Sequence, residues 1–125
     1  MEFYTINQTN VTNAIADAVV GREQELFSYD MNIVNYEIML ADLPEGEWPE
    51  NLAQYKRSTL DQVPDQLDEI VNQYQYRDRI KMLLKTERLE RSKSFKIYEA
   101  LLSRIPEADR SSVIAAAQAR LAPQP

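Results

Sequence analysis

Residues 15–43 of the chain read IADAVVGREQELFSYDMNIVNYEIMLADL, and this stretch decides the predicted fold. Its apolar residues recur at steps of four and three, which is the spacing of an α-helix that buries a face. The spacing gives a first seam of Ile15, Val19, Arg22, Leu26, Tyr29, Ile33, Tyr36, Leu40 and Leu43, and a second seam of Val20, Gln24, Phe27, Met31, Val34, Ile38 and Ala41. Seams about 100° apart, the turn of one residue step, predict contact with two neighbours and therefore a bundle of at least three helices.

We predict that this helix covers residues 10–43. Thr9 or Asn10 can cap its start, because either side chain accepts a hydrogen bond from a free backbone N–H group. Both seams keep their phase through Gly21, so the helix is expected to continue there. At ~1.5 Å per residue the helix is roughly 50 Å long. It offers more apolar surface than a 125-residue chain can cover by itself, which predicts a partner.

A corner between helices is predicted at residues 42–50, DLPEGEWPE, which hold the only tryptophan. Pro44 ends the first helix, and Gly46 permits the turn that follows. Trp48 has two interpretations. It can seal the corner by packing on Leu52 in the next helix, which we prefer. It can also anchor a partner protein, since tryptophan is enriched in interface hot spots.

Three further helices are predicted from the apolar spacing and from the prolines at their limits, over residues 50–63, 65–105 and 107–121. The chain is therefore expected to form one all-α domain over residues 1–125, an elongated helical hairpin or bundle with two long and two short helices. Inside the second long helix, residues 85–94 read KTERLERSKS and contain one large apolar residue. A helix that is polar all round is exposed or held by ion pairs, so this part is predicted to protrude or bend.

Residues 77–96 include eight basic and three acidic residues, and Tyr74 and Tyr76 precede them. Basic residues near aromatic ones are typical of nucleic-acid surfaces, and Arg88 and Arg91 would be central to such a contact. The overall pI near 4.7 argues against a dedicated nucleic-acid binder. The other interpretation is a basic face that pairs with the acidic first helix.

Charge is divided unevenly along the chain. Residues 1–69 carry three basic and fourteen acidic residues, a net charge of −11, whereas residues 70–125 carry eleven and six, a net charge of +5. This asymmetry favours pairing of the two halves, within one chain or between copies.

Several chemistries find no support in the sequence. It contains no histidine and no cysteine, which excludes histidine-based triads, thiol nucleophiles and His/Cys zinc sites within the chain. Two glycines leave no phosphate-binding loop. Acids cluster at Asp61, Asp65, Asp68 and Glu69, where they complement a helix N-terminus and lack a cation-loop spacing. We therefore predict no catalytic residue, no cofactor and no metal ion.

The sequence also bears on location. No run of about 18 apolar residues is present, which argues against a membrane span. The N-terminus MEFYTINQTN lacks the pattern of an export signal, and the lack of cysteine fits a reducing compartment. The expected location is the cytoplasm, or a particle assembled there.

The first hypothesis for function is a non-catalytic helical assembly or adaptor protein that associates with itself in a homo-oligomer or larger assembly. The alternative is an acidic helical regulator or inhibitor that binds a protein partner, and the third is nucleic-acid contact through residues 77–96. The predicted partner-binding residues are Phe27, Met31, Val34, Ile38, Trp48, Tyr74, Tyr76, Arg88 and Arg91. The chain is small, acidic, free of cysteine and predicted to consist of long helices. In these general properties it resembles phage-encoded accessory and virion proteins, although no sequence motif carries that resemblance.

Overall fold

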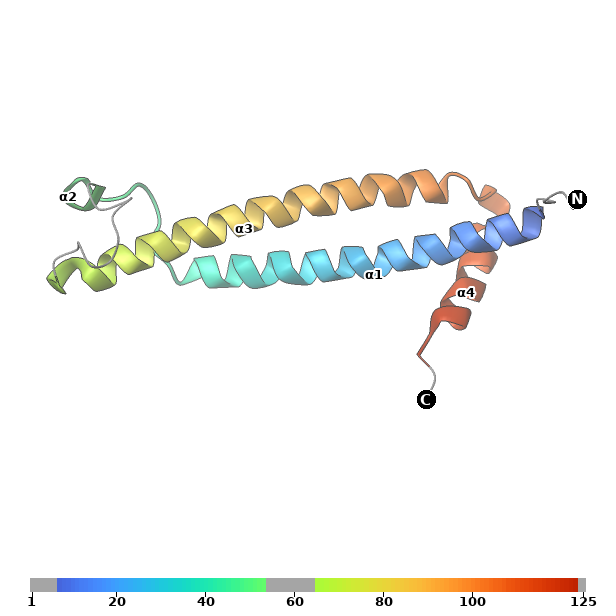
Figure 1. The fold of residues 1–125 in the computed structure, drawn as a ribbon, viewed down its shortest axis with the longest axis horizontal. Helices are drawn as coiled ribbons and strands as arrows, with labels where there is room; N and C mark the ends of the chain where they lie inside the picture. Colours follow the sequence, from blue (N-terminus) through green and yellow to red (C-terminus); the bar gives the residue numbers. More distant parts are fainter. Residues whose placement is uncertain (1–6, 54–64, 124–125) are drawn as a thin grey trace, which may run out of the picture. The chain divides into compact units, whose positions relative to one another are not determined.

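The computed structural model describes residues 7–53 and 65–123, and it is all-helical over these two ranges (Figure 1). The elements in chain order are α1 (Gln8–Ala41), the short α2 (Glu50–Ala53), α3 (Asp65–Leu102), the 3-10 turn η2 (Glu107–Asp109) and α4 (Arg110–Leu121). No strand occurs in the two ranges. The two long helices are those that the apolar spacing predicts, so the predicted all-α class is confirmed.

Helix α1 begins two residues earlier than predicted. The reason is that Asn7 caps it, in place of Thr9 or Asn10. The Asn7 side-chain oxygen accepts a hydrogen bond from the backbone N–H of Asn10 at 3.2 Å, which satisfies one of the free donors of the first turn. The helix then passes through Gly21 without a break, as its unbroken seams predict.

The other helix limits also shift by a few residues. Helix α1 ends at Ala41, and α3 ends at Leu102 and not at Ile105. A turn follows α3, closed by a 3.1 Å hydrogen bond from the Ile105 N–H to the Leu102 carbonyl. The predicted short helix begins at Glu50 as α2, and its remaining residues 54–63 lie outside the described part of the chain.

Helix α3 continues without interruption through its polar segment, residues 85–94. On the side toward α1, polar groups of the two helices satisfy one another. Arg91 forms a salt bridge with Asp30, and the buried Ser94 hydroxyl donates a hydrogen bond to a Glu25 carboxylate oxygen at 3.3 Å. The prediction that this segment protrudes is therefore corrected, because contacts with α1 hold it.

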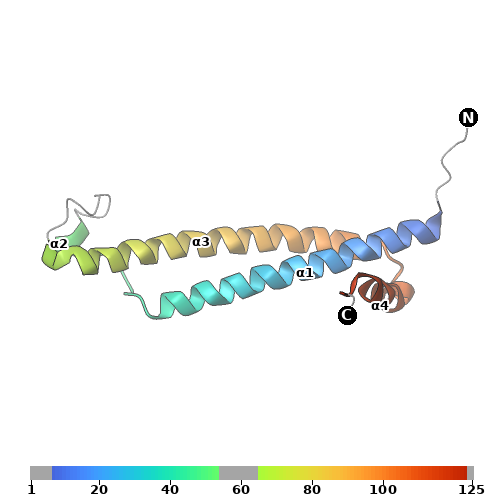
Figure 2. The same ribbon diagram turned by 60° about the horizontal axis from the view of Figure 1, so that its bottom comes forward.

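The chain forms two compact units, and each is described by itself. The first, called the α4 unit, contains the described residues up to Asp30 and from Glu90 onward, with α4 among them. The second, called the corner unit, contains Met31–Leu89 and holds the turn after α1. Within each unit a segment of α1 and a segment of α3 lie side by side and run antiparallel (Figure 1, Figure 2).

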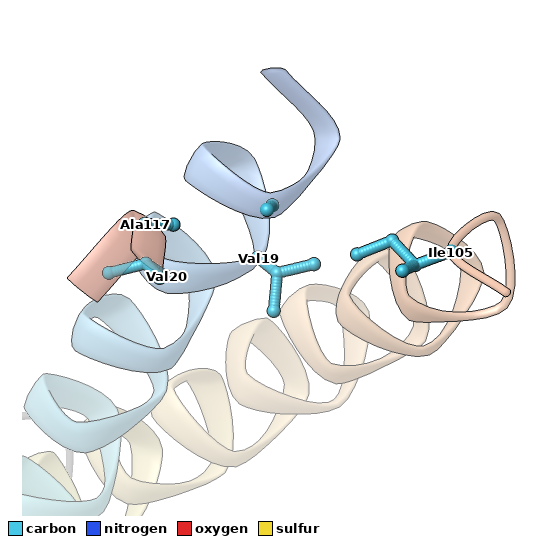
Figure 3. Close-up of a cluster of buried hydrophobic side chains, with 5 residues drawn as sticks. Val19, Val20, Ile105 and Ala117 are labelled. Carbon is cyan, nitrogen blue, oxygen red and sulfur yellow. The ribbon is translucent and has the colours of Figure 1, made fainter. Parts of the chain in front are cut away.

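The α4 unit has a small apolar core to which α1, α3 and α4 all contribute. Its buried residues are Ala16, Val19, Val20, Ile105 and Ala117, and partly buried neighbours are Ile15, Tyr98, Leu101, Leu102, Val113 and Ile114. Val19 of the first seam and Ile105 point toward each other, while Ala117 of α4 lies beside Val20 of the second seam (Figure 3). Here α1 has the two neighbours that its two seams predict.

The second seam points away from α3. Its offset from the first seam alternates between one and two residues, so the mean angle between them is about 150° at ~100° per residue, which corrects the predicted 100°. Val19 and Leu26 of the first seam are buried. On the second seam α4 covers Val20, but the next four large apolar residues, Phe27, Met31, Val34 and Ile38, are exposed.

Candidate protein interface

An exposed apolar stripe runs along α1 just beyond the position that α4 covers. We call it the second-seam face and define it by Phe27, Met31, Val34 and Ile38, which are 67%, 45%, 48% and 61% exposed. The steps between these residues along the unbroken helix α1 are four, three and four, with Phe27 in the α4 unit and the other three in the corner unit. A contiguous exposed apolar patch on a protein surface is characteristic of an interaction site, whereas single exposed apolar residues are ordinary.

One flank of the second-seam face is acidic in sequence but neutralised in the structure. Asp30 forms a salt bridge with Arg91, and Glu37 forms one with Arg88 at 3.1 Å. Exposed pairs of this kind stabilise a fold by about 0–1 kcal/mol. Their effect on the stripe is more important, because they leave fewer unpaired carboxylates beside it. They also confirm that the acidic and basic halves of the chain pair with each other.

The opposite flank of the second-seam face carries no charge. Gly21, Ser28 and Asn35 follow one another there at steps of seven residues, and all three are exposed. The Ser28 hydroxyl donates a hydrogen bond to the backbone carbonyl of Gln24 at 3.2 Å, so it does not compete for a partner group. The face is thus apolar along its centre and small and polar along one edge, which suits close approach of another helix.

The corner residues Trp48 and Tyr74 are buried inside the chain. Their rings lie 5.2 Å apart between centroids, in a cluster with Leu52 and Val71. The Trp48 indole N–H donates a hydrogen bond to an Asp78 carboxylate oxygen at 2.9 Å. This arrangement supports the preferred interpretation of Trp48 as the seal of the corner. Both rings are thus covered by the chain itself, at 8% and 9% exposed.

A buried arginine fastens the corner to α3. Arg77 is 4% exposed, and its guanidinium donates hydrogen bonds to the Pro44 carbonyl at 3.1 Å and the Gly46 carbonyl at 2.5 Å. It also bonds the Asp78 carboxylate at 3.0 Å and lies 4.8 Å from the centre of the Tyr74 ring. Gly46 has a φ of +82°, a left-handed conformation that favours glycine. The backbone carbonyls of this turn therefore find a donor that the sequence did not identify.

The basic stretch at residues 77–96 is only partly available to a partner. Four of its eight basic residues take part in salt bridges, namely Arg77, Arg88, Arg91 and Lys93. Lys81 and Lys85 instead line an open groove of about 710 Å³ with Leu40 and Leu84 as apolar walls. Tyr76 beside the stretch is 44% exposed. Internal pairing leaves less positive charge here than the sequence suggests, which weakens the case for a nucleic-acid surface.

Comparison of the chain with protein-family models, with curated proteins and with solved structures finds no match. Among the residues that the structure describes, no helix is both long enough and apolar enough to cross a membrane. Within the same residues, no group of three or more acidic, histidine or cysteine side chains is arranged to hold a metal ion. Of the predicted acid cluster, Asp61 and the side chains of Asp65 and Asp68 lie outside the described part.

Trp48 provides a direct test of the corner. Because it is the only tryptophan and is 8% exposed, its fluorescence is expected to be blue-shifted and resistant to quenching by acrylamide or iodide. The same protein unfolded in urea supplies the reference for an exposed indole. Red-shifted emission that iodide quenches readily in the native protein would contradict the burial described above.

Proposed function

We propose that this protein is a non-catalytic α-helical assembly or adaptor protein that associates with itself through the second-seam face. The observation that carries the proposal is the stripe of four exposed apolar residues on one long helix. Two features of its surroundings support it. The carboxylates of Asp30 and Glu37 are already paired with α3, and the other flank is uncharged. Such a protein acts in the cytoplasm or as a component of a particle assembled there.

The size of the face sets an expectation for affinity. Complete burial of an apolar side chain contributes about 1.5–3 kcal/mol to the free energy of association. The four side chains of the face are roughly half exposed before association, so each contributes about half of that amount. The eight side chains of two copies then contribute on the order of 8 kcal/mol, against an association cost of about 4–15 kcal/mol. Pairing through this face alone is therefore expected to be weak and concentration-dependent, and further contacts in a larger assembly would strengthen it.

Absence of catalysis is part of the proposal and rests on the sequence. The chain has no histidine or cysteine to serve as a base or thiol nucleophile. On α1, the carboxylates of Asp30 and Glu37 form salt bridges with α3, and a Glu25 carboxylate oxygen accepts a hydrogen bond from Ser94 of α3. An open surface with an apolar stripe is typical of a site for another protein, whereas small-molecule sites are usually concave.

Replacing Phe27 by Asp is expected to weaken self-association by roughly a hundredfold or more, because each copy loses about 1.5 kcal/mol and 1.4 kcal/mol is a factor of ten. The measurement is molar mass by light scattering across a concentration series, with helicity followed by circular dichroism. Phe27 is 67% exposed, so helix content is expected to stay unchanged.

Ala18→Asp is the matched control, since it adds the same charge to α1 at an exposed position outside the second seam. It is expected to self-associate like the original protein. If Phe27→Asp and Ala18→Asp behave alike, the second-seam face is not the contact. If the original protein stays monomeric at every concentration, self-association is excluded and a regulator that binds a different protein becomes the better hypothesis.

A further inference from the structure

We propose that an open groove in the corner unit binds an acidic amphipathic helix of another protein. The groove has a volume of about 710 Å³, and residues of both long helices line it: Glu37, Leu40, Lys81, Leu84, Lys85 and Arg88. We call it the lysine groove, and all six residues belong to the corner unit. The proposal goes beyond self-association, because it assigns a second site to a different kind of partner and does not depend on the second-seam face.

Two cations of the lysine groove have no partner in the described part of the chain. Lys81 and Lys85 are exposed, and neither forms a salt bridge with a described residue. They are four residues apart on α3, so their side chains emerge on the same side of the helix, one turn apart. Further along α3, Arg88 is already paired with Glu37 at 3.1 Å. Three cations and one carboxylate therefore leave the groove with a net charge of +2.

The apolar part of the lysine groove comes from one leucine of each long helix. Leu84 is 6% exposed and Leu40 is partly buried, so the two side chains supply an apolar floor. A smaller cavity of about 300 Å³ shares Leu40 and Lys81 with the groove and extends it toward the turn at Pro44. An apolar floor beside basic side chains suits an amphipathic segment, whose apolar side chains point inward and whose acids meet the lysines.

A helix is the form of partner that fits this place. Within the described part of the corner unit, only α1 and α3 line the lysine groove, and their segments run antiparallel (Figure 1, Figure 2). A pair of packed helices offers a groove into which a third helix can pack, as α4 does within its own unit. Carboxylates four residues apart on such a helix lie about 5–6 Å apart, which matches the spacing of Lys81 and Lys85.

Nearby carboxylates limit what the lysine groove can bind. Glu45 lines the adjoining cavity together with Lys81, and the whole chain has a net charge of −6. A nucleic acid would bring a row of phosphates against these carboxylates, and two free lysines offer few cations in return. A helix with two acids beside an apolar stripe places its charge only where the lysines lie. Local charge complementarity therefore favours an acidic protein segment.

Designed helical peptides test the proposal on the full chain. The probe is a labelled peptide of about 15 residues with a leucine stripe and two glutamates four residues apart along one edge of the stripe. It is made in three registers of the glutamates against the leucines, each with a matched peptide that has glutamine in place of both glutamates. Fluorescence anisotropy at low salt measures binding, and NMR shifts of the Leu40 and Leu84 methyl groups locate it.

At least one register of the glutamate peptide is expected to bind. The double variant Lys81→Gln, Lys85→Gln should weaken this binding roughly fivefold, the effect of losing two exposed ion pairs. The double variant Arg79→Gln, Lys96→Gln is the matched control, because it changes the charge of α3 equally at exposed positions outside the groove. It should bind like the original protein. The glutamine peptide should bind the original protein and the groove variant equally, since the coupling between acids and lysines is then absent.

The proposal is wrong if no register of the glutamate peptide binds, if the glutamine peptide binds as tightly, or if the control variant loses as much affinity as the groove variant. A single-stranded oligonucleotide that binds in place of the peptides, and is lost in the groove variant, would assign the groove to nucleic acid. A lower molar mass of the groove variant by light scattering would assign it to a second copy. The second-seam face is unchanged in these proteins, so the proposed self-association is decided separately by Phe27→Asp.

Discussion

Replacing Arg77 by Met is expected to lower the free energy of unfolding of the corner unit by about 3 kcal/mol. Methionine keeps an apolar stem of similar length, so packing on Tyr74 is largely retained. The hydrogen bonds to the carbonyls of Pro44 and Gly46 are lost, and so is the salt bridge to Asp78. A buried polar group left without its partner costs more than the bond itself contributed, so the two carbonyls that lose their donor add to the expected loss.

The measurement is urea unfolding followed by Trp48 fluorescence, which reports on the corner because no other tryptophan is present. Arg79→Met is the matched control, with the same chemical change two residues away at an exposed position. Its effect is expected within about 0.5 kcal/mol. Equal unfolding midpoints for the two variants would mean that the guanidinium of Arg77 is replaced by water at no cost, contrary to its burial.

The second large effect is expected in the α4 unit. Replacing Ile105 by Ala should lower the free energy of unfolding by about 3 kcal/mol, within the range of about 2–5 kcal/mol for deleting a fully buried isoleucine side chain. Ile105 is 0% exposed and points toward Val19 in the small core that joins α1, α3 and α4 (Figure 3). A core with few members cannot close around the space that the deletion leaves.

Urea unfolding followed by circular dichroism measures this effect, with Ile97→Ala as its control. The control deletes the same atoms from a residue of α3 that is 43% exposed, and its cost is expected to be under about 1 kcal/mol. Should the two deletions cost the same, the core described here would not be what holds α4 in place. Amide hydrogen exchange in α4 provides an independent reading, because loss of this core should release that helix first.

Local pattern in the sequence predicts the helices well and their ends poorly. The two seams predict that α1 forms and that it continues through Gly21, since the spacing of apolar residues is a property of one helix alone. The cap at Asn7 and the end of α3 at Leu102 differ from prediction by a few residues. Several side chains near each end can cap or continue a helix, so the choice depends on contacts that the spacing does not show.

The residues of the candidate interface were predicted from the sequence, but the exposure of their side chains to solvent was not. The second seam of α1 is apparent in the spacing of Phe27, Met31, Val34 and Ile38, and the sequence alone assigns it to some neighbour. The charges of the two halves likewise predict that basic residues pair with acidic ones. Neither pattern states which neighbour covers which residue, because a periodic stripe looks the same whether a helix of the same chain or another copy lies against it.

Only the tertiary structure decided how far the chain covers its own apolar surface. It placed α4 on the second seam at Val20 and left the following stripe open, and it brought Arg77 under the carbonyls of Pro44 and Gly46. It also showed that the polar segment of α3 contacts α1, through the salt bridge of Arg91 with Asp30 and the hydrogen bond of Ser94 with Glu25. The physical reason is the separation of the residues along the chain. These contacts join residues about 30 to 100 positions apart, so they form only when the helices and turns pack together. The sequence by itself determined the helices, because their formation depends on neighbours three and four residues away.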